Sequence, residues 1–168
     1  MAVPRNYRSM SLLLADGTVY TGGGGLCPTA FGASDGHCNR AIDHPNGGVF
    51  TTPYLVKADR TPATRPVINS LSSNSAVNGF SVRPGGTLNV EMNDGTGVTF
   101  ALLRIGSATH SVNSDQRRIA LTNVVANGNQ FTITIPTDSG VLTPGPYFLF
   151  ALSKNKVPSM ARTARVTR

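Results

Sequence analysis

Hydrophobic and polar residues alternate along short stretches of this chain, and this pattern predicts β-strands separated by turns. The first two stretches, Ser9–Leu14 and Thr18–Thr21, flank the tripeptide Ala15-Asp16-Gly17. Asp-Gly between two such stretches is a strong signal for a β-hairpin, because glycine readily adopts the positive φ of a tight turn. Four glycines, Gly22–Gly25, follow directly. We therefore expect an N-terminal hairpin whose end allows another backbone segment to approach closely.

The rest of the chain predicts further strands at the spacing of a β-sandwich. A short strand around Phe50 is expected in Gly48–Val56, and a proline-containing linker follows it, with Pro62 and Pro66. The run Pro146–Ser153 is continuously apolar, which suits a central strand that is buried on both faces. The other expected strands are Leu88–Met92, Val98–Ile105, Phe131–Ile135 and Met160–Thr167.

Composition agrees with an all-β protein of about one domain. The chain has 168 residues and a mass of 17.6 kDa, and charged residues make up only 14% of it. A single Glu, Glu91, together with 18 Gly and 11 Pro, excludes a helical bundle or a coiled coil. No apolar run reaches 18 residues, so no membrane-spanning helix is expected, and the first 17 residues do not have the pattern of a signal peptide.

The net charge of +7 and the pI of about 10.1 raise the question of nucleic-acid binding. The basic residues are spread along the chain, and Arg117-Arg118 is the only adjacent pair. No recognition helix or aromatic platform is predicted. We therefore favour a solvated basic face, or a contact with an anionic polysaccharide, over nucleic acid. The densest basic segment lies near the C-terminus and contains Lys154, Lys156, Arg162, Arg165 and Arg168.

Two cysteines, Cys27 and Cys38, lie in a loop rich in Gly, Ser, Asp and Pro. They lack the partner residues of a zinc site. A disulfide between them would close a short ring and could contribute about 3 kcal/mol in the chain-entropy model, which fits an oxidising compartment. Two free buried thiols are the alternative.

A polar segment and several longer strings carry a resemblance to a known family. The first half of Ser107–Asn127 has no helical period and predicts a long polar loop, which on a β-scaffold often serves function. The strings are RNYRSMSLLLADGTVYTGGGGLC, NGGVFTTPYL, ATRPVI, GSATHSVNSDQRRIALT and PGPYFLFALSKNKVPSMARTARVT. Together they resemble the C-terminal part of the copper-radical oxidases, the family that contains galactose oxidase and glyoxal oxidase.

The resemblance implies an architecture and an activity. Residues 1–60 would be the last blade of a kelch propeller and its closing strand, and residues 64–168 an immunoglobulin-like (early-set) β-sandwich. Complete enzymes of the family oxidise alcohols or aldehydes, including carbohydrates, and reduce O2 to H2O2. The resemblance also implies an extracellular location and a structural pair of cysteines, to which Cys27 and Cys38 correspond.

The resemblance further implies a copper site, at which this sequence departs from the family. His110 corresponds to a copper-binding histidine on a long sandwich loop, and Tyr7 to the axial tyrosine, which is the catalytic base. The family has a second histidine after that tyrosine, whereas this chain has Arg8. A guanidinium stays protonated and offers no lone pair to a metal. The radical tyrosine belongs to earlier blades, so we expect this chain alone to be inactive and its copper binding to be doubtful.

Two further expectations concern the polar loop that contains His110 and an alternative function for the chain. Asp115, Arg117 and Arg118 are interpreted as a charged group that braces the loop, with solvated side chains as the alternative. A non-catalytic interaction module, with polysaccharide as the candidate partner, is the alternative to an oxidase portion. The missing propeller is a further candidate partner.

Overall fold

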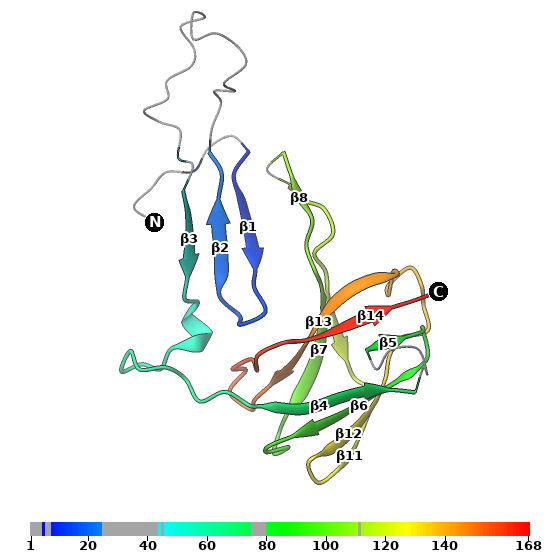
Figure 1. The fold of residues 1–168 in the computed structure, drawn as a ribbon. Coiled ribbons are helices and arrows are strands. Elements are labelled where there is room, and N and C mark those ends of the chain that lie inside the picture. The colour runs from blue at the N-terminus through cyan, green and yellow to red at the C-terminus, as the bar shows by residue number, and fades with distance from the viewer. Residues whose placement is uncertain (1–4, 6–7, 25–43, 45, 75–79, 111) are drawn as a thin grey trace, which may run out of the picture.

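The computed structural model describes residues 5, 8–24, 44, 46–74, 80–110 and 112–168. Within these residues the chain forms a small three-stranded sheet followed by a two-sheet sandwich (Figure 1). In this described part, the regular structure is almost entirely β, as the sequence predicts, apart from a short 3-10 helix. The described residues contain no helix that is long and apolar enough to cross a membrane.

The N-terminal sheet is antiparallel and has the order β1-β2-β3. Its strands are β1 (Met10–Leu13), β2 (Val19–Gly22) and β3 (Gly47–Phe50). The turn between β1 and β2 closes through a bond from Leu14 N to the Thr18 carbonyl at 2.9 Å, and Gly17 adopts a φ of 80°. The expected hairpin is therefore confirmed.

Glycines in β2 and β3 make room for an aromatic ring. Gly22 and Gly47 are paired across the two strands. A Cβ atom at either position would lie 2.5 Å from the hydroxyl oxygen of Tyr20. The Tyr20 ring can therefore lie over this end of the sheet only because both neighbours lack side chains.

The sandwich consists of a five-stranded and a four-stranded sheet. The five-stranded sheet has the order β10-β7-β13-β14-β5, and all of its pairs are antiparallel except β14 with β5. Its strands are β5 (Ser81–Val82), β7 (Thr99–Arg104), β10 (Arg118–Leu121), β13 (Gly145–Leu152) and β14 (Arg162–Val166). The four-stranded sheet, in the order β11-β12-β6-β4, consists of β4 (Ile68–Ser73), β6 (Thr87–Met92), β11 (Val124–Asn127) and β12 (Gln130–Thr134).

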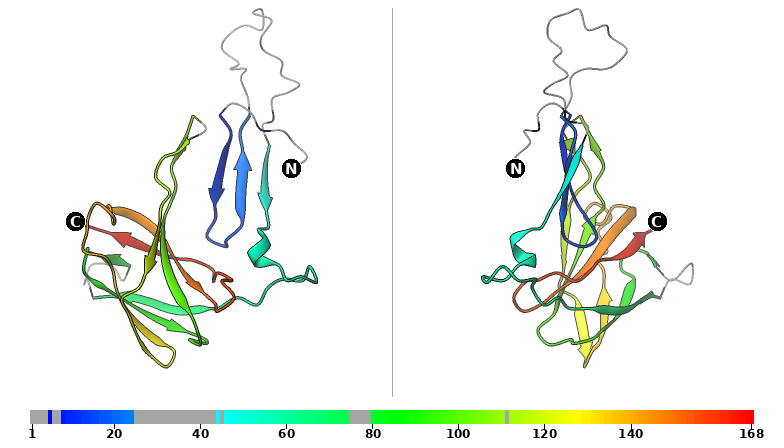
Figure 2. Two further views of the ribbon diagram at one scale, coloured as in Figure 1. Left: turned by 180° about the vertical axis from the view of Figure 1, so that it is seen from behind. Right: turned by 60° about the vertical axis from the view of Figure 1, so that its left-hand side comes forward.

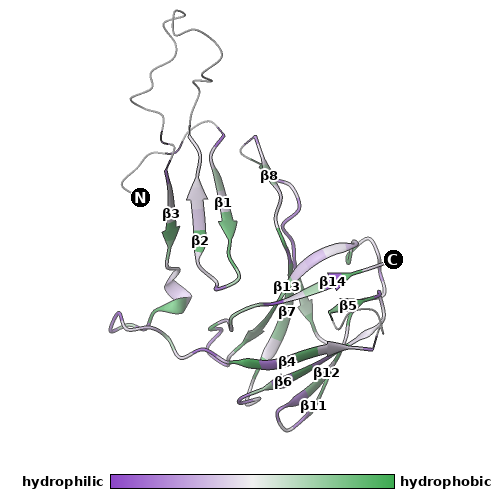
Figure 3. Ribbon diagram, in the orientation of Figure 1, coloured by the Kyte–Doolittle hydropathy of each residue, from purple (hydrophilic) through white to green (hydrophobic). Residues whose placement is uncertain are grey.

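The main core lies between these two sheets, as the alternation in the sequence predicts. Leu88 and Val90 of β6 are fully buried, whereas Asn89 between them is exposed. An edge-to-face contact between Phe100 and Phe131, with ring centroids 5.0 Å apart, joins the two sheets. Figure 3 shows the hydrophobic stretches that these strands contribute.

Strand β13 is apolar on both faces because both are covered. Leu149 belongs to the core between the sheets, and Phe150 faces the other way, yet only 3% of Phe150 is exposed. On that outer face Phe150 lies near Leu13 of the N-terminal sheet and near Tyr54 and Pro158. The outer face of the five-stranded sheet therefore forms a second, smaller apolar region under the N-terminal sheet.

Hydrogen bonds fix the N-terminal sheet to the sandwich. The 3-10 helix η2 (Pro53–Leu55) places the Tyr54 hydroxyl 2.7 Å from the Gly17 carbonyl, to which it donates. Ala161 N donates to the Ala15 carbonyl at 2.8 Å. In the linker, Arg65 donates to the carbonyls of Pro158 and Ser159 at 2.8 and 2.6 Å. Figure 2 shows how the sheet stands on the sandwich.

The structure confirms one of the expected segments, corrects another and adds further strands. The short strand expected around Phe50 is confirmed as β3, which ends at Phe50 because Pro53 begins the 3-10 helix. The segment expected to be a long polar loop contains a short hairpin, described below, and its end enters β10. Strands β4, β5 and β11 are additional to those expected from the sequence.

Candidate functional site: a hairpin that carries His110

The candidate site lies at the tip of a hairpin that projects from the sandwich. Strands β8 (Ala108–Thr109) and β9 (Val112–Asn113) pair in an antiparallel register, Ala108 with Asn113 and Thr109 with Val112. This hairpin stands beside β1, on the same side of the sandwich as the N-terminal sheet (Figures 1 and 2). It therefore brings the residues near position 110 close to β1.

His110 lies in the turn of this hairpin. Its side chain is exposed and its φ of 49° is in the left-handed region, which is uncommon for a residue other than glycine. The Thr109 hydroxyl oxygen lies 2.7 Å from His110 Nδ1, within hydrogen-bonding distance. This contact engages Nδ1, so Nε2 is the ring nitrogen that is better placed to bind a metal ion.

The base of the hairpin is held by short-range hydrogen bonds. Ser114 N donates to the Ser107 carbonyl at 3.2 Å, and Asn113 Nδ2 donates to Gln116 Oε1 at 2.7 Å. Gly106 leaves room for this amide, because a Cβ atom there would lie 2.7 Å from Asn113 Oδ1 and would displace it. The polar residues of this segment therefore form the contacts that shape the hairpin.

Arg104, at the end of β7, connects the returning arm of the hairpin to the sandwich. Its Nη1 donates to the Pro144 carbonyl at 2.7 Å and to the Thr143 hydroxyl at 3.0 Å. Its Nη2 lies 3.4 Å from Asp115 Oδ2, and its guanidinium lies over the Tyr147 ring, 5.7 Å from the centroid. Tyr147 and, to a lesser degree, the charge of Asp115 raise the pKa of Arg104, which therefore stays protonated.

The three residues that the sequence suggested as bracing the loop have separate partners. Asp115 pairs with Arg104 and not with Arg117 or Arg118. Arg117 donates to the carbonyls of Gly140 and Val141 at 3.0 and 3.2 Å. Arg118 is exposed on β10 and lines a pocket on the outer face of the five-stranded sheet. Sequence reasoning missed Arg104, because its partners around position 143 are about 40 residues away and no motif marks them.

The beginning of the chain lies close to the glycine segment that follows β2. Arg5 donates from Nη1 to the Gly23 and His44 carbonyls at 2.9 and 3.0 Å. Arg8 is exposed with a φ of 59°, and its carbonyl packs so closely on Gly23 that no side chain would fit there. Tyr7, Cys27 and Cys38 lie outside the described residues.

The described residues do not fit a copper ion. Copper(II) in proteins takes several nitrogen, oxygen or sulfur ligands at once. No group of three His, Cys, Asp or Glu side chains comes together in the part of the chain that the structure describes. Of the ligand positions that the resemblance suggests, these residues include His110 and the position of Arg8, whose guanidinium cannot coordinate.

The fold and the hairpin define an immunoglobulin-like β-sandwich with a projecting loop, and comparison with known proteins gives its family. Residues 65–166 match the model of the "Galactose oxidase-like, Early set domain" family, to which the chain therefore belongs. Two sequences named galactose oxidase from Gibberella zeae, one of them from strain PH-1, are each 41% identical to it over 167 residues. The alignment covers 99% of this chain, which spans only 22% of the length of each relative.

A solved structure agrees with this assignment. The structure of a fungal alcohol oxidase of the AA5 family, in complex with copper, superimposes with a TM-score of 0.84 and 41% sequence identity. The match covers 100% of this chain and 32% of the other. The likeness to galactose oxidase-like copper oxidases that the sequence suggested is therefore confirmed, over a part of those proteins.

Proposed function

We propose that this chain is the C-terminal portion of a galactose oxidase-like copper oxidase. Residues 1–60 would contribute the last kelch blade with its closing strand, and residues 64–168 the sandwich. The activity of the whole protein would be the oxidation of an alcohol or aldehyde, for example of a carbohydrate, with reduction of O2 to H2O2. The observation that carries the proposal is the hairpin beside β1, with His110 at its tip.

In this proposal the sandwich serves to position His110. The Arg104 cluster fixes the return of the hairpin to the sandwich, and the hydrogen bonds from Ala161 and Tyr54 fix the N-terminal sheet. These two sets of contacts would set the position of His110 relative to Tyr7. An extracellular location and a Cys27–Cys38 disulfide are parts of the same proposal, supported by the family resemblance.

Arg8 leads us to propose that the 168 residues alone do not catalyse the oxidation. A positive charge at this position disfavours a nearby metal cation and replaces a nitrogen ligand. We expect no H2O2 from galactose or glyoxal above a blank that contains copper alone. Production of H2O2 above that blank would contradict the proposal.

Copper titration tests whether Tyr7 and His110 converge. We expect weak Cu(II) binding by the unmodified chain, followed by isothermal titration, and tighter binding by Arg8→His. The matched control is Arg8→His combined with His110→Ala, which keeps the new histidine and removes the hairpin ligand. It should return the affinity to that of the unmodified chain. Equal affinities of the unmodified chain and Arg8→His would show that the three positions do not form a site.

A non-catalytic binding module is the second candidate, and Arg8 favours it because it removes a metal ligand. The exposed basic residues Lys154, Lys156, Arg165 and Arg168 suit an anionic polysaccharide. Co-sedimentation with polygalacturonate, which is anionic, compared with cellulose, which is neutral, tests this candidate. Salt-sensitive binding to polygalacturonate together with unchanged copper affinity in Arg8→His would favour the binding module over the oxidase portion.

A further inference from the structure

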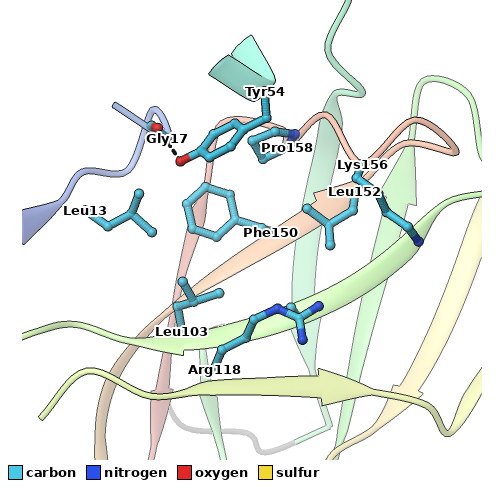
Figure 4. A pocket seen from close by; sticks show the side chains of 10 residues that line it. Leu13, Gly17, Tyr54, Leu103, Arg118, Phe150, Leu152, Lys156 and Pro158 are labelled. Carbon is cyan, nitrogen blue, oxygen red and sulfur yellow. Dashed lines mark hydrogen bonds between the residues drawn. The ribbon is translucent and has the colours of Figure 1, made fainter. Parts of the chain in front are cut away.

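A pocket lies between the outer face of the five-stranded sheet and the N-terminal sheet (Figure 4). Its volume is about 330 Å³. Its apolar walls come from β1, β7, β13 and the segments that join the two sheets, and are formed by Leu13, Leu103, Phe150, Leu152, Tyr54 and Pro158. It lies in a different part of the molecule from the His110 hairpin tip.

The walls of this pocket are fixed by hydrogen bonds. Gly17, at its upper edge, accepts from the Tyr54 hydroxyl at 2.7 Å and from the Thr52 hydroxyl at 3.0 Å. Lys156 N donates to the Ser153 carbonyl at 2.8 Å, which closes the turn that precedes Pro158. Because these contacts hold both sides of the pocket, it is preformed, as small-molecule sites generally are.

Two cations lie at the edge of the apolar surface. Figure 4 shows Arg118 below the apolar side chains and Lys156 at their right. Both residues are exposed, and no Asp or Glu is among the described residues that line the pocket. Neither has a carboxylate within ion-pair distance in the described part of the chain. The pocket thus combines an apolar interior with uncompensated positive charge at its mouth.

We propose that this pocket binds a small organic anion with an apolar body, such as a medium-chain carboxylate. The apolar part would lie against Phe150 and Leu103, and the carboxylate would lie between Arg118 and Lys156. The volume is near the lower end of the range for small-molecule sites, which suits a ligand of about ten non-hydrogen atoms. The proposal is independent of the proposed function, because it uses none of the copper positions.

Octanoate is the probe, and 1-octanol is its uncharged counterpart. Titration of the 168-residue chain with octanoate should shift amide resonances of residues around the pocket in 1H–15N spectra. The double variant Arg118→Gln/Lys156→Gln should weaken octanoate binding about three- to tenfold, because exposed charge pairs contribute modestly. The matched control Arg83→Gln/Arg165→Gln removes two exposed arginines that do not line the pocket, and should leave the affinity unchanged.

Three results would overturn the proposal. Octanol could bind as tightly as octanoate, which would remove the role of charge. The control variant could lose as much affinity as the pocket variant, which would indicate a general effect of net charge. Octanoate could fail to bind because a second copy of the chain covers the pocket. Light scattering would then show a dimer, and the pocket variant or a bulky Leu103→Phe change would disrupt that dimer.

Discussion

Tyr147→Phe removes a hydroxyl at the beginning of β13 that makes one short hydrogen bond and one longer contact, 3.3 Å from the Thr143 hydroxyl oxygen. The Tyr147 side chain is fully buried, and its hydroxyl donates to the Thr143 carbonyl at 2.8 Å. Phenylalanine keeps the ring and therefore keeps the packing. The Thr143 carbonyl retains Arg104 Nη1 as a donor at 3.2 Å, so no buried acceptor is left unsatisfied. The expected cost is therefore that of a single net hydrogen bond, about 1 kcal/mol of unfolding free energy.

Equilibrium unfolding in urea, followed by far-ultraviolet circular dichroism, measures this cost. The same change should lower Tm by about 2–4 °C in a protein of this size. Tyr54→Phe is the matched control, because it removes the same atom from a side chain that is 41% exposed. Its acceptor, the Gly17 carbonyl, keeps the Thr52 hydroxyl, so we expect a cost below about 0.5 kcal/mol. Equal costs for the two variants would refute the reasoning that burial gives the Tyr147 hydroxyl its larger effect.

Three more predictions concern the turn, the core and the loop. The Thr18 hydroxyl, at 2.6 Å, and the Thr18 N–H donate to the Asp16 carboxylate and hold its pKa below the ordinary 3.8. These bonds therefore stabilise the folded chain above pH 3.8, and the stabilisation is lost as the pH falls through the lower pKa of the folded state. Acid titration should therefore destabilise the unmodified chain more than Asp16→Asn in this range, and equal pH profiles would contradict the assignment. Leu102→Ala, in the fully buried centre of β7, should cost about 2–5 kcal/mol in urea unfolding, whereas a cost near zero would mean that the sandwich core is not packed there. Asp115→Ala should lower the free energy of unfolding by less than about 1 kcal/mol, because the Asp115 side chain is 43% exposed. Arg104→Met should lower it more, because this change also removes the hydrogen bonds to residues 143 and 144. The reverse order in urea unfolding would be inconsistent with the observed contacts.

The strands of the sandwich could be predicted because the order of apolar and polar residues along each strand follows which of its faces are buried. In β6 and β12 one face is buried and the other is exposed or half-buried, and the sequence alternates accordingly. In β13 both faces are covered, and the sequence is a continuous apolar run. The β1–β2 turn was predictable because Asp16 and Gly17 have the chemistry that its geometry requires.

The hairpin and its support could not be predicted from local patterns. Strands β8 and β9 have only two residues each, so they are too short to show alternation. They are shaped by hydrogen bonds of Ser107 and Asn113, which in sequence indicate only a loop. His110 and Arg8 could be singled out by family resemblance, whereas Arg104 acquires its role only when β7 meets the segment before β13.

The anchoring of the N-terminal sheet has a consequence for synthesis on the ribosome. Ala15 and Arg65 find their partners among Pro158–Ala161, close to the end of the 168 residues. At about 5–20 residues per second, several seconds pass between the synthesis of β1 and β2 and the synthesis of those partners. During that interval β1 and β2 lack the surface on which they finally rest, with only the nearby β3 available as a further pairing partner, and such small isolated sheets are marginally stable. The order of translation therefore makes the docking of β1 and β2 on the sandwich a late event relative to their own synthesis.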